Sequence, residues 1–155
     1  MSRLADIPIR IESAPIKSAA ALGGLGGGVA AILSELVTLL ERLAERDEPA
    51  MIDLRSLPMG PQDRVELQRA LGDGEVQATV SAQGLSNIRE TGVAGVWWVE
   101  HRDAQGDLVA EMIEVGRVPL ILASASDEIA SGALALRERI AAAAAPASGE
   151  NNVTQ

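Results

Sequence analysis

The chain of 155 residues has no cysteine, no phenylalanine and no tyrosine, and it has one histidine. Without cysteine it can form no disulfide, and it offers no thiolate as nucleophile, redox group or metal ligand. Tight transition-metal sites usually combine several imidazoles or thiolates, so His101 alone predicts neither a metal site nor a metal cofactor. Two tryptophans are the only aromatic residues, and the core must therefore be aliphatic.

Positive charge is also scarce. Thirteen Lys and Arg stand against 22 Asp and Glu, which gives a formal net charge of −9. Such a surface repels phosphates, and no cluster of Lys or Arg offsets it, so we expect no nucleic-acid partner. Between residues 73 and 114, eight acidic residues stand against two basic ones. This segment is interpreted either as the solvated face of a sheet or as a docking surface for a basic segment.

Long apolar runs are missing as well. The first residues lack a basic region followed by an apolar run, and no stretch of about 20 apolar residues is present to span a bilayer. The longest apolar segment, residues 19–33, is short and rich in glycine. The sequence predicts a cytoplasmic protein that does not insert into membranes.

Three segments have the pattern of helices. Apolar residues of the segment 29–46 recur on one wide stripe. A second helix is predicted over 61–71, where a proline suits the first turn and Gly72 is placed to end the helix. A third is predicted from residue 126 or 127 to about 145, because Ser126 or Asp127 could cap it and Pro146 breaks it.

The first two of these helices carry the aliphatic residues that a core needs. They are Ile32, Leu33, Leu36, Val37, Leu39, Leu40 and Leu43 in the first helix, and Val65, Leu67 and Leu71 in the second. The stripe of the first helix is interpreted as core-facing. A dimer or partner interface is the alternative, because seven large aliphatic residues exceed what a surface helix needs.

Strand patterns separate these helices. Apolar and polar residues alternate over 76–81, a second strand is predicted over 95–101, and the turn 103–107 leads into a further strand that ends at Val115. Residues 7–12 also alternate and predict a short strand or extended arm.

This order of elements favours an α+β fold, a small antiparallel sheet of three to four strands packed by about three helices. We expect an N-terminal arm and glycine-rich joint over 1–28, one domain over 29–145 and a disordered tail over 146–155. Neighbouring residues of a strand point to opposite faces, so at least one indole of Trp97 and Trp98 is expected near the surface.

Candidate chemistry is sparse. Residues 23–28 (GGLGGG) have a spacing found in nucleotide-binding loops, but no strand immediately precedes them and the Lys-Ser/Thr pair of a P-loop is missing, so they are interpreted as a flexible joint. Glu90, Glu111 and Glu114, with His101, are the candidates for an acid–base pair. Alternation in half-exposed strands explains the positions of the three glutamates without catalysis.

A family resemblance rests on four short motifs and their order. They are GDGEV (72–76), IRET (88–91), GVWWV (95–99) and IEV (113–115), the last followed by a proline, and IDLRSLPM (52–59) lies upstream. Together they resemble the C-terminal domain of the HupH/HyaF hydrogenase expression/formation proteins over about residues 30–122. With room for a single such unit, the chain is similar to the short HupJ or HoxT branch. Residues 92–94 depart from the family, which often has an aromatic residue and a proline in this loop.

The resemblance implies a non-catalytic accessory protein, a chaperone or scaffold without cofactors, that assists maturation of a [NiFe] hydrogenase. The implied partners are the precursor of the iron–sulfur small subunit, sister accessory proteins, or both. The residues expected to form or support the contact surface are Gly72, Gly74, Glu75, Glu90, Thr91, Gly95, Trp97, Trp98, Glu111 and Glu114. Two alternatives stay open: an oligomerisation or interaction module with another partner, in which the stripe from Ile32 to Leu43 pairs with a second copy, and a small carboxylate-dependent hydrolase.

Overall fold

The computed structural model describes residues 24–144. They fall into two compact units, the first ending at Gly116 and the second beginning at Arg117. Each unit is described here by itself. The predicted strand or arm over 7–12 and the predicted tail over 146–155 lie outside the described residues. The division into an arm, one domain and a tail stays a prediction.

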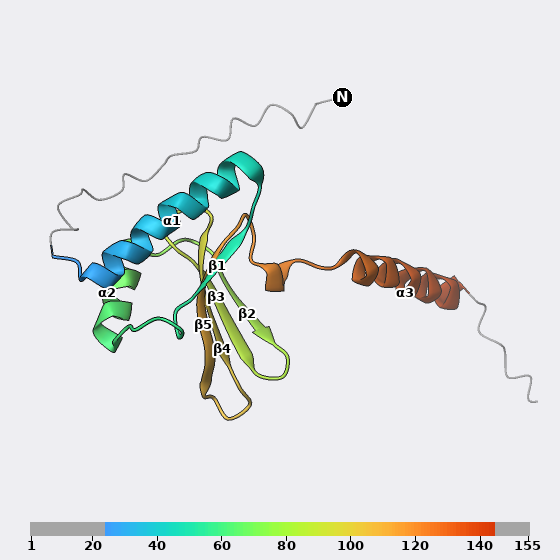
Figure 1. The fold of residues 1–155 in the computed structure, drawn as a ribbon. Helices are drawn as coiled ribbons and strands as arrows, with labels where there is room; N and C mark the ends of the chain where they lie inside the picture. The colour runs from blue at the N-terminus through green and yellow to red at the C-terminus, as the bar shows by residue number, and fades with distance from the viewer. Residues whose placement is uncertain (1–23, 145–155) are drawn as a thin grey trace, which may run out of the picture. The chain divides into compact units, whose positions relative to one another are not determined.

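The first unit is a two-layer α+β structure, in which two helices lie together on one side of a sheet (Figure 1). Its elements are α1 (Gly27–Arg46), β1 (Ala50–Asp53), α2 (Pro61–Leu71), β2 (Gln77–Ser81), β3 (Leu85–Glu90), β4 (Val96–Arg102) and β5 (Leu108–Val115). The strands form one antiparallel sheet in the order β1-β5-β4-β3-β2. Strands β2 to β5 form a meander, and β1, which precedes them in the chain, pairs with β5 at the edge of the sheet. The predicted α+β class is confirmed.

The sheet has five strands, where the sequence predicted three to four. β1 is only four residues long, too short for a clear alternation of its own. β3 lacks a clean alternation. Its first residue, Leu85, is exposed, Ile88 is buried, and the other four residues are half-buried. Pairing with β2 and β4 therefore makes it a strand, rather than its own pattern.

The helix α1 faces the core, as predicted. Its buried residues are Val29, Ile32, Leu36, Leu39 and Leu43. Val37, which was counted in the same stripe, is 56% exposed. The helix ends at Asp47, whose left-handed backbone (φ 57°) lets its N–H bond back to the carbonyl of Leu43.

The helix α2 begins and ends where proline and glycine predict. The carboxylate of Asp63 accepts a hydrogen bond from the N–H of Gly60 at 2.7 Å, next to Pro61. Leu67 and Leu71 are buried, but Val65 is 46% exposed, so its predicted anchoring role is wrong. Val65 precedes both of these residues and lies on the opposite side of the helix, turned away from the core.

Both faces of the sheet are apolar, and this buries both tryptophans. Trp98 is 2% exposed and packs with α1 and α2, while Trp97 is 7% exposed on the opposite face with Ile88 and Val99. The Trp97 indole N–H donates to the carbonyl of Gly116 at 3.0 Å. The prediction of one indole near the surface is wrong, because the face away from the helices has an apolar cluster of its own.

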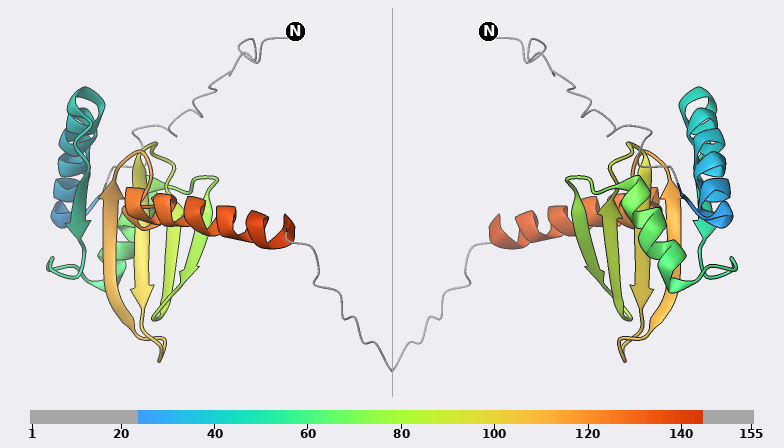
Figure 2. Two further views of the ribbon diagram at one scale, coloured as in Figure 1. Left: turned by 90° about the vertical axis from the view of Figure 1, so that its right-hand side faces the viewer. Right: turned by 90° about the vertical axis from the view of Figure 1, so that its left-hand side faces the viewer.

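The second unit contains a 3-10 turn, η2 (Leu120–Leu122), and the helix α3 (Ser126–Ala144), which confirms the predicted third helix (Figure 2). Asp127 and Glu128 lie in its first turn, where negative charge is favourable. None of its described residues is buried. None of the described helices combines the length and hydropathy that a membrane span requires.

Candidate functional site

The turn between β3 and β4 is fixed by one buried hydroxyl. Thr91 is 5% exposed, and its Oγ1 lies 3.0 Å from the carbonyl oxygen of Val96 and 3.2 Å from that of Val93, while it accepts the N–H of Val93 at 3.2 Å. The Thr91 backbone N–H donates to the same Val96 carbonyl at 3.0 Å. Gly95 supplies the positive φ (82°) that returns the chain into β4. The IRET motif therefore ends in a residue that closes this turn.

The segment after α2 passes very close to the end of β3. Gly74 donates its N–H to the carbonyl of Glu90 at 3.0 Å, and a Cβ at Gly74 would lie 2.6 Å from the carbonyl oxygen of Thr91. A side chain cannot be placed there without moving the backbone. The Glu90 carboxylate accepts the N–H groups of Glu75 and Val76 at 3.2 and 3.3 Å. The glycines of GDGEV therefore permit a backbone crossing that Glu90 holds in place.

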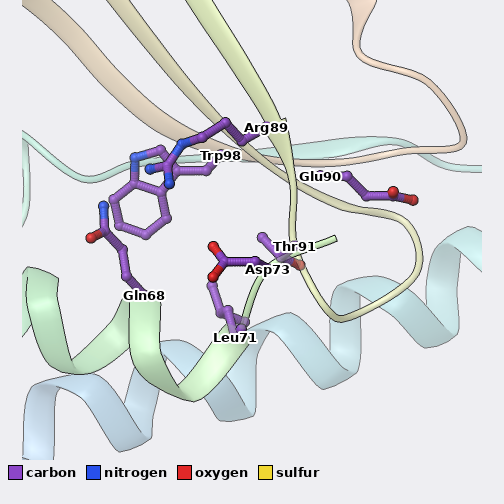
Figure 3. A pocket seen from close by; sticks show the side chains of 8 residues that line it. Gln68, Leu71, Asp73, Arg89, Glu90, Thr91 and Trp98 are labelled. Carbon is purple, nitrogen blue, oxygen red and sulfur yellow. The ribbon is translucent and has the colours of Figure 1, made fainter. Parts of the chain in front are cut away.

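A small hollow lies beside this crossing (Figure 3). Its cavity volume is about 10 Å³, and it is lined by Gln68, Leu71, Gly72, Asp73, Arg89, Glu90, Thr91 and Trp98. Small-molecule sites usually enclose about 300–1,000 Å³, so the hollow is below that range. The side chains of Arg89, Gln68 and Trp98 gather at one side, while the Glu90 carboxylate points away from them. The buried indole N–H of Trp98 has no acceptor within the described part of the chain.

The candidate carboxylates are divided between the two faces of the sheet. Glu111 lies on the helix side, 4% exposed, with its Oε2 2.7 Å from the Nε of Arg64 on α2. Glu90 and Glu114 lie on the other face, each opposite Trp97 in the strand register. The sheet therefore separates Glu111 from the other two glutamates, and of the three only Glu90 lines the hollow.

His101 has a hydrogen-bonding role in the sheet. Its Nδ1 lies 2.6 Å from the Oγ of Ser86, the residue opposite it on β3, and the side chain is partly buried. Among residues 24–144, no three His, Asp or Glu side chains are grouped so as to hold a metal ion.

Part of the glycine-rich segment is helix rather than joint. Gly27 and Gly28 form the first turn of α1, and the N–H of Gly26 donates to the carboxylate of Glu66 at 3.2 Å. The interpretation of these residues as a flexible joint is therefore wrong for this part. The start of the helix, where a nucleotide phosphate would bind, is occupied by a carboxylate of the chain itself.

An open groove at the β1–β5 side of the sheet was not predicted. It spans about 750 Å³, open solvent included, and is lined by Met51, Asp53, Arg55, Ser56, Val109, Ala110 and Met112. The guanidinium of Arg55 donates to the carbonyl oxygens of Leu108 and Val109. Met51 in β1 and Met112 in β5 were the available signal, but only the pairing of β1 with β5 brings them together.

The structure places the predicted contact residues at very different depths. Gly72 and Glu75 are exposed; Gly74, Glu90, Gly95 and Glu114 are half-buried; Thr91, Trp97, Trp98 and Glu111 are buried. Gly72, Gly74, Glu75, Glu90 and Thr91 come together at the crossing, whereas Glu111 lies elsewhere on the helix face. The buried members can support a contact surface but do not present their side chains to a partner. That these ten residues form or support such a surface stays a prediction.

The fold and the motif geometry together define a two-layer α+β domain. The residues of its motifs, here called the signature residues (72–76, 88–91 and 95–99), build a turn, a backbone crossing and a small hollow. Residues 28–143 match the family described as HupH hydrogenase expression protein, C-terminal conserved region. The chain belongs to this family. The resemblance seen over residues 30–122 is thereby confirmed, and the match extends through nearly all of α3.

Relatives and a solved structure agree with this assignment. The chain is 32% identical over 109 residues to the hydrogenase expression/formation protein HoxQ of Azotobacter vinelandii, and 29% identical over 107 residues to HupH of Rhizobium leguminosarum bv. viciae. Each match covers 69% of this chain and 38% of the relative. The hydrogenase expression protein HupH from Thiobacillus denitrificans has a similar structure, with a TM-score of 0.70 and 40% identity over 75% of this chain and 97% of that one. The chain thus spans well under half the length of the curated relatives that it matches.

Proposed function

We propose that this protein is a non-catalytic accessory protein, a chaperone or scaffold, for maturation of a [NiFe] hydrogenase. The observation that carries the proposal is the family match over residues 28–143, since the relatives are named hydrogenase expression/formation proteins. The geometry supports a binding role. The signature residues hydrogen-bond to one another and to the backbone, and the hollow beside them is below the size of ordinary substrate sites.

The partner proposed is the precursor of the iron–sulfur small subunit, a sister accessory protein, or both. Binding would occur in the cytoplasm, without insertion of this chain into a membrane. A large partner needs a broad surface, and the first unit offers two separate candidates. The β1–β5 groove exposes Met51 and Val109, at 60% and 51%, and flexible methionine suits adaptable apolar contacts. The crossing near Gly72 carries the exposed carboxylates of Asp73 and Glu75.

The acidic crossing is proposed to attract a basic segment of the partner. Asp73 and Glu90 line the hollow, and the Glu75 N–H donates to the Glu90 carboxylate. The only guanidinium among the residues that line the hollow, that of Arg89, is 3.7 Å from Glu100. Attraction between exposed charges is screened over about 8 Å at physiological ionic strength. Association should therefore weaken as salt is added and when Asp73 and Glu75 are both changed to Lys.

The role is tested by deleting the gene in a hydrogenase-producing host and measuring hydrogenase activity and processing of the small subunit. Loss of both, restored by the wild-type chain, is the expected result, together with co-purification of a hydrogenase subunit or accessory protein on the tagged full chain. The matched control for the double change of Asp73 and Glu75 to Lys is the pair Glu41→Lys and Glu45→Lys on the exposed side of α1. It changes the net charge equally at a different place and should leave the association unchanged. Normal hydrogenase activity in the deletion strain would contradict the proposal.

A further inference from the structure

The helix α3 carries an apolar stripe whose large side chains are all exposed. Ile129, Leu136 and Ile140 are 62, 57 and 62% exposed, and Ala133 and Ala143 continue the stripe. Their spacing alternates between four and three residues, which is the seam of a two-stranded coiled coil. At 100° per residue, all five lie within about 40° of Ile129 on either side.

A helix of this kind requires a partner surface. α3 has 19 residues and no buried side chain, and in proteins most helical stability comes from packing of an apolar face. Three large aliphatic side chains aligned along about 17 Å of helix form a continuous exposed surface. The stripe also lies within the region that matches the family model, which extends to residue 143.

We propose that α3 pairs with α3 of a second copy of this chain, antiparallel, across this stripe. In the register that places Ile129 opposite Ile140 of the other copy, Ala133 faces Leu136. Every layer then combines side chains whose volumes suit one another, and the arrangement is its own two-fold image, as a closed dimer requires. A parallel pair would instead set Ala133 against Ala133 between layers of large side chains, which leaves a void.

The charge of α3 is compatible with a second copy. The whole chain carries a net charge of −9, but α3 has three acidic residues, Asp127, Glu128 and Glu138, against the two arginines 137 and 139, so two copies of it are nearly neutral to each other. In the antiparallel register Arg137 lies beside Ala130 of the other copy and Arg139 beside Gly132, where the long stems fit over small residues.

The area sets the strength of the pairing. Stable interfaces bury in total at least about 1,000 Å², whereas a strip about 21 Å long and about 10 Å wide gives about 200 Å² of facing surface on each copy, well below that limit. The dimer is therefore weak and depends on concentration.

The helix provides a closely matched control. Leu134 is 58% exposed, almost the same as Leu136 at 57%, but it is turned about 140° from Ile129 and lies outside the stripe. Sedimentation equilibrium of the full chain over roughly 1 to 500 µM should show a monomer–dimer equilibrium. Leu136→Glu should raise its dissociation constant by at least about tenfold, because it places a charge in the apolar seam. Leu134→Glu should change it by less than about threefold, and circular dichroism checks that both variants keep the same helix content.

Introduced thiols test the orientation, and the absence of natural cysteine makes them unambiguous. A mixture of Ala133→Cys and Leu136→Cys chains should form a mixed disulfide dimer under mild oxidation, because these positions face each other in the antiparallel register. Either variant alone should cross-link far less.

Three outcomes would overturn the proposal. They are a monomer at every concentration, equal effects of the two glutamate variants, or cross-linking as efficient within one variant as in the mixture. None of these measurements involves a hydrogenase component, so they are independent of the proposed function.

Discussion

The ion pair between Arg64 and Glu111 should contribute far more stability than its exposed counterpart in the same chain. Arg64 Nε donates to Glu111 Oε2 at 2.7 Å, and the two side chains are 28% and 5% exposed. Arg64 also donates to the carbonyl of Met59 at 3.1 Å. The pair thus joins α2 to the central part of β5, under the helix layer.

Replacing Glu111 by Ala removes the acceptor and leaves a partly buried guanidinium. Breaking a buried pair in this way lowers the free energy of unfolding by about 3–5 kcal/mol. Because water reaches part of Arg64, we expect the lower end, about 3 kcal/mol. Replacing both residues, Arg64 by Met and Glu111 by Leu, should restore most of this loss, since no unpaired charge remains.

The assay is urea unfolding followed by tryptophan fluorescence, because both tryptophans of the first unit are buried and become exposed on unfolding. The control is Glu48→Ala, which removes the partner of Arg42 at 2.8 Å from a pair whose side chains are 51% and 42% exposed. That loss should be below about 1 kcal/mol. Equal losses for Glu111→Ala and Glu48→Ala would refute the reasoning that burial decides the contribution.

Three further substitutions test the turn and the crossing by the same unfolding assay. Gly74→Ala should destabilise by about 1–3 kcal/mol, because its Cβ would be 2.6 Å from the carbonyl oxygen of Thr91; the control Gly28→Ala, with no atom within 4 Å, should instead stabilise α1 by about 0.5–1 kcal/mol. Thr91→Val keeps the shape but loses the hydroxyl, so it should cost about 1–3 kcal/mol, and an unchanged midpoint would show that this hydroxyl does not fix the turn. Trp97→Phe loses the bond to the Gly116 carbonyl, for an expected loss of about 1–2 kcal/mol beyond that of the smaller ring; retention of full stability would count against that bond.

The helices were predictable from the sequence because their signals are local. The repeat of apolar residues locates α1, and Pro61 and Gly72 fix the ends of α2 within the chain itself. The hairpin between β4 and β5 was predictable for the same reason, since the turn residues between Asp103 and Asp107 form it: both Gln105 and Asp107 donate to the Asp103 carboxylate at 2.9 Å.

The rest depends on contacts between distant segments. β3 has one buried residue, Ile88, and becomes a strand only through its neighbours. The burial of both Trp97 and Trp98 requires apolar residues on both faces of the sheet, which alternation within one strand cannot reveal. The motifs near Gly74 and Glu90 were identified from the sequence, but their close crossing appears only when the two segments are placed together.

The placement of one indole on each side of the sheet gives this protein two separate optical reporters. A variant that keeps only Trp98 would sense movements of α1 and α2, whereas one that keeps only Trp97 would sense the face of the sheet away from the helices. A partner protein that altered the fluorescence emission of one tryptophan and not of the other would thereby reveal which side of the sheet it covers.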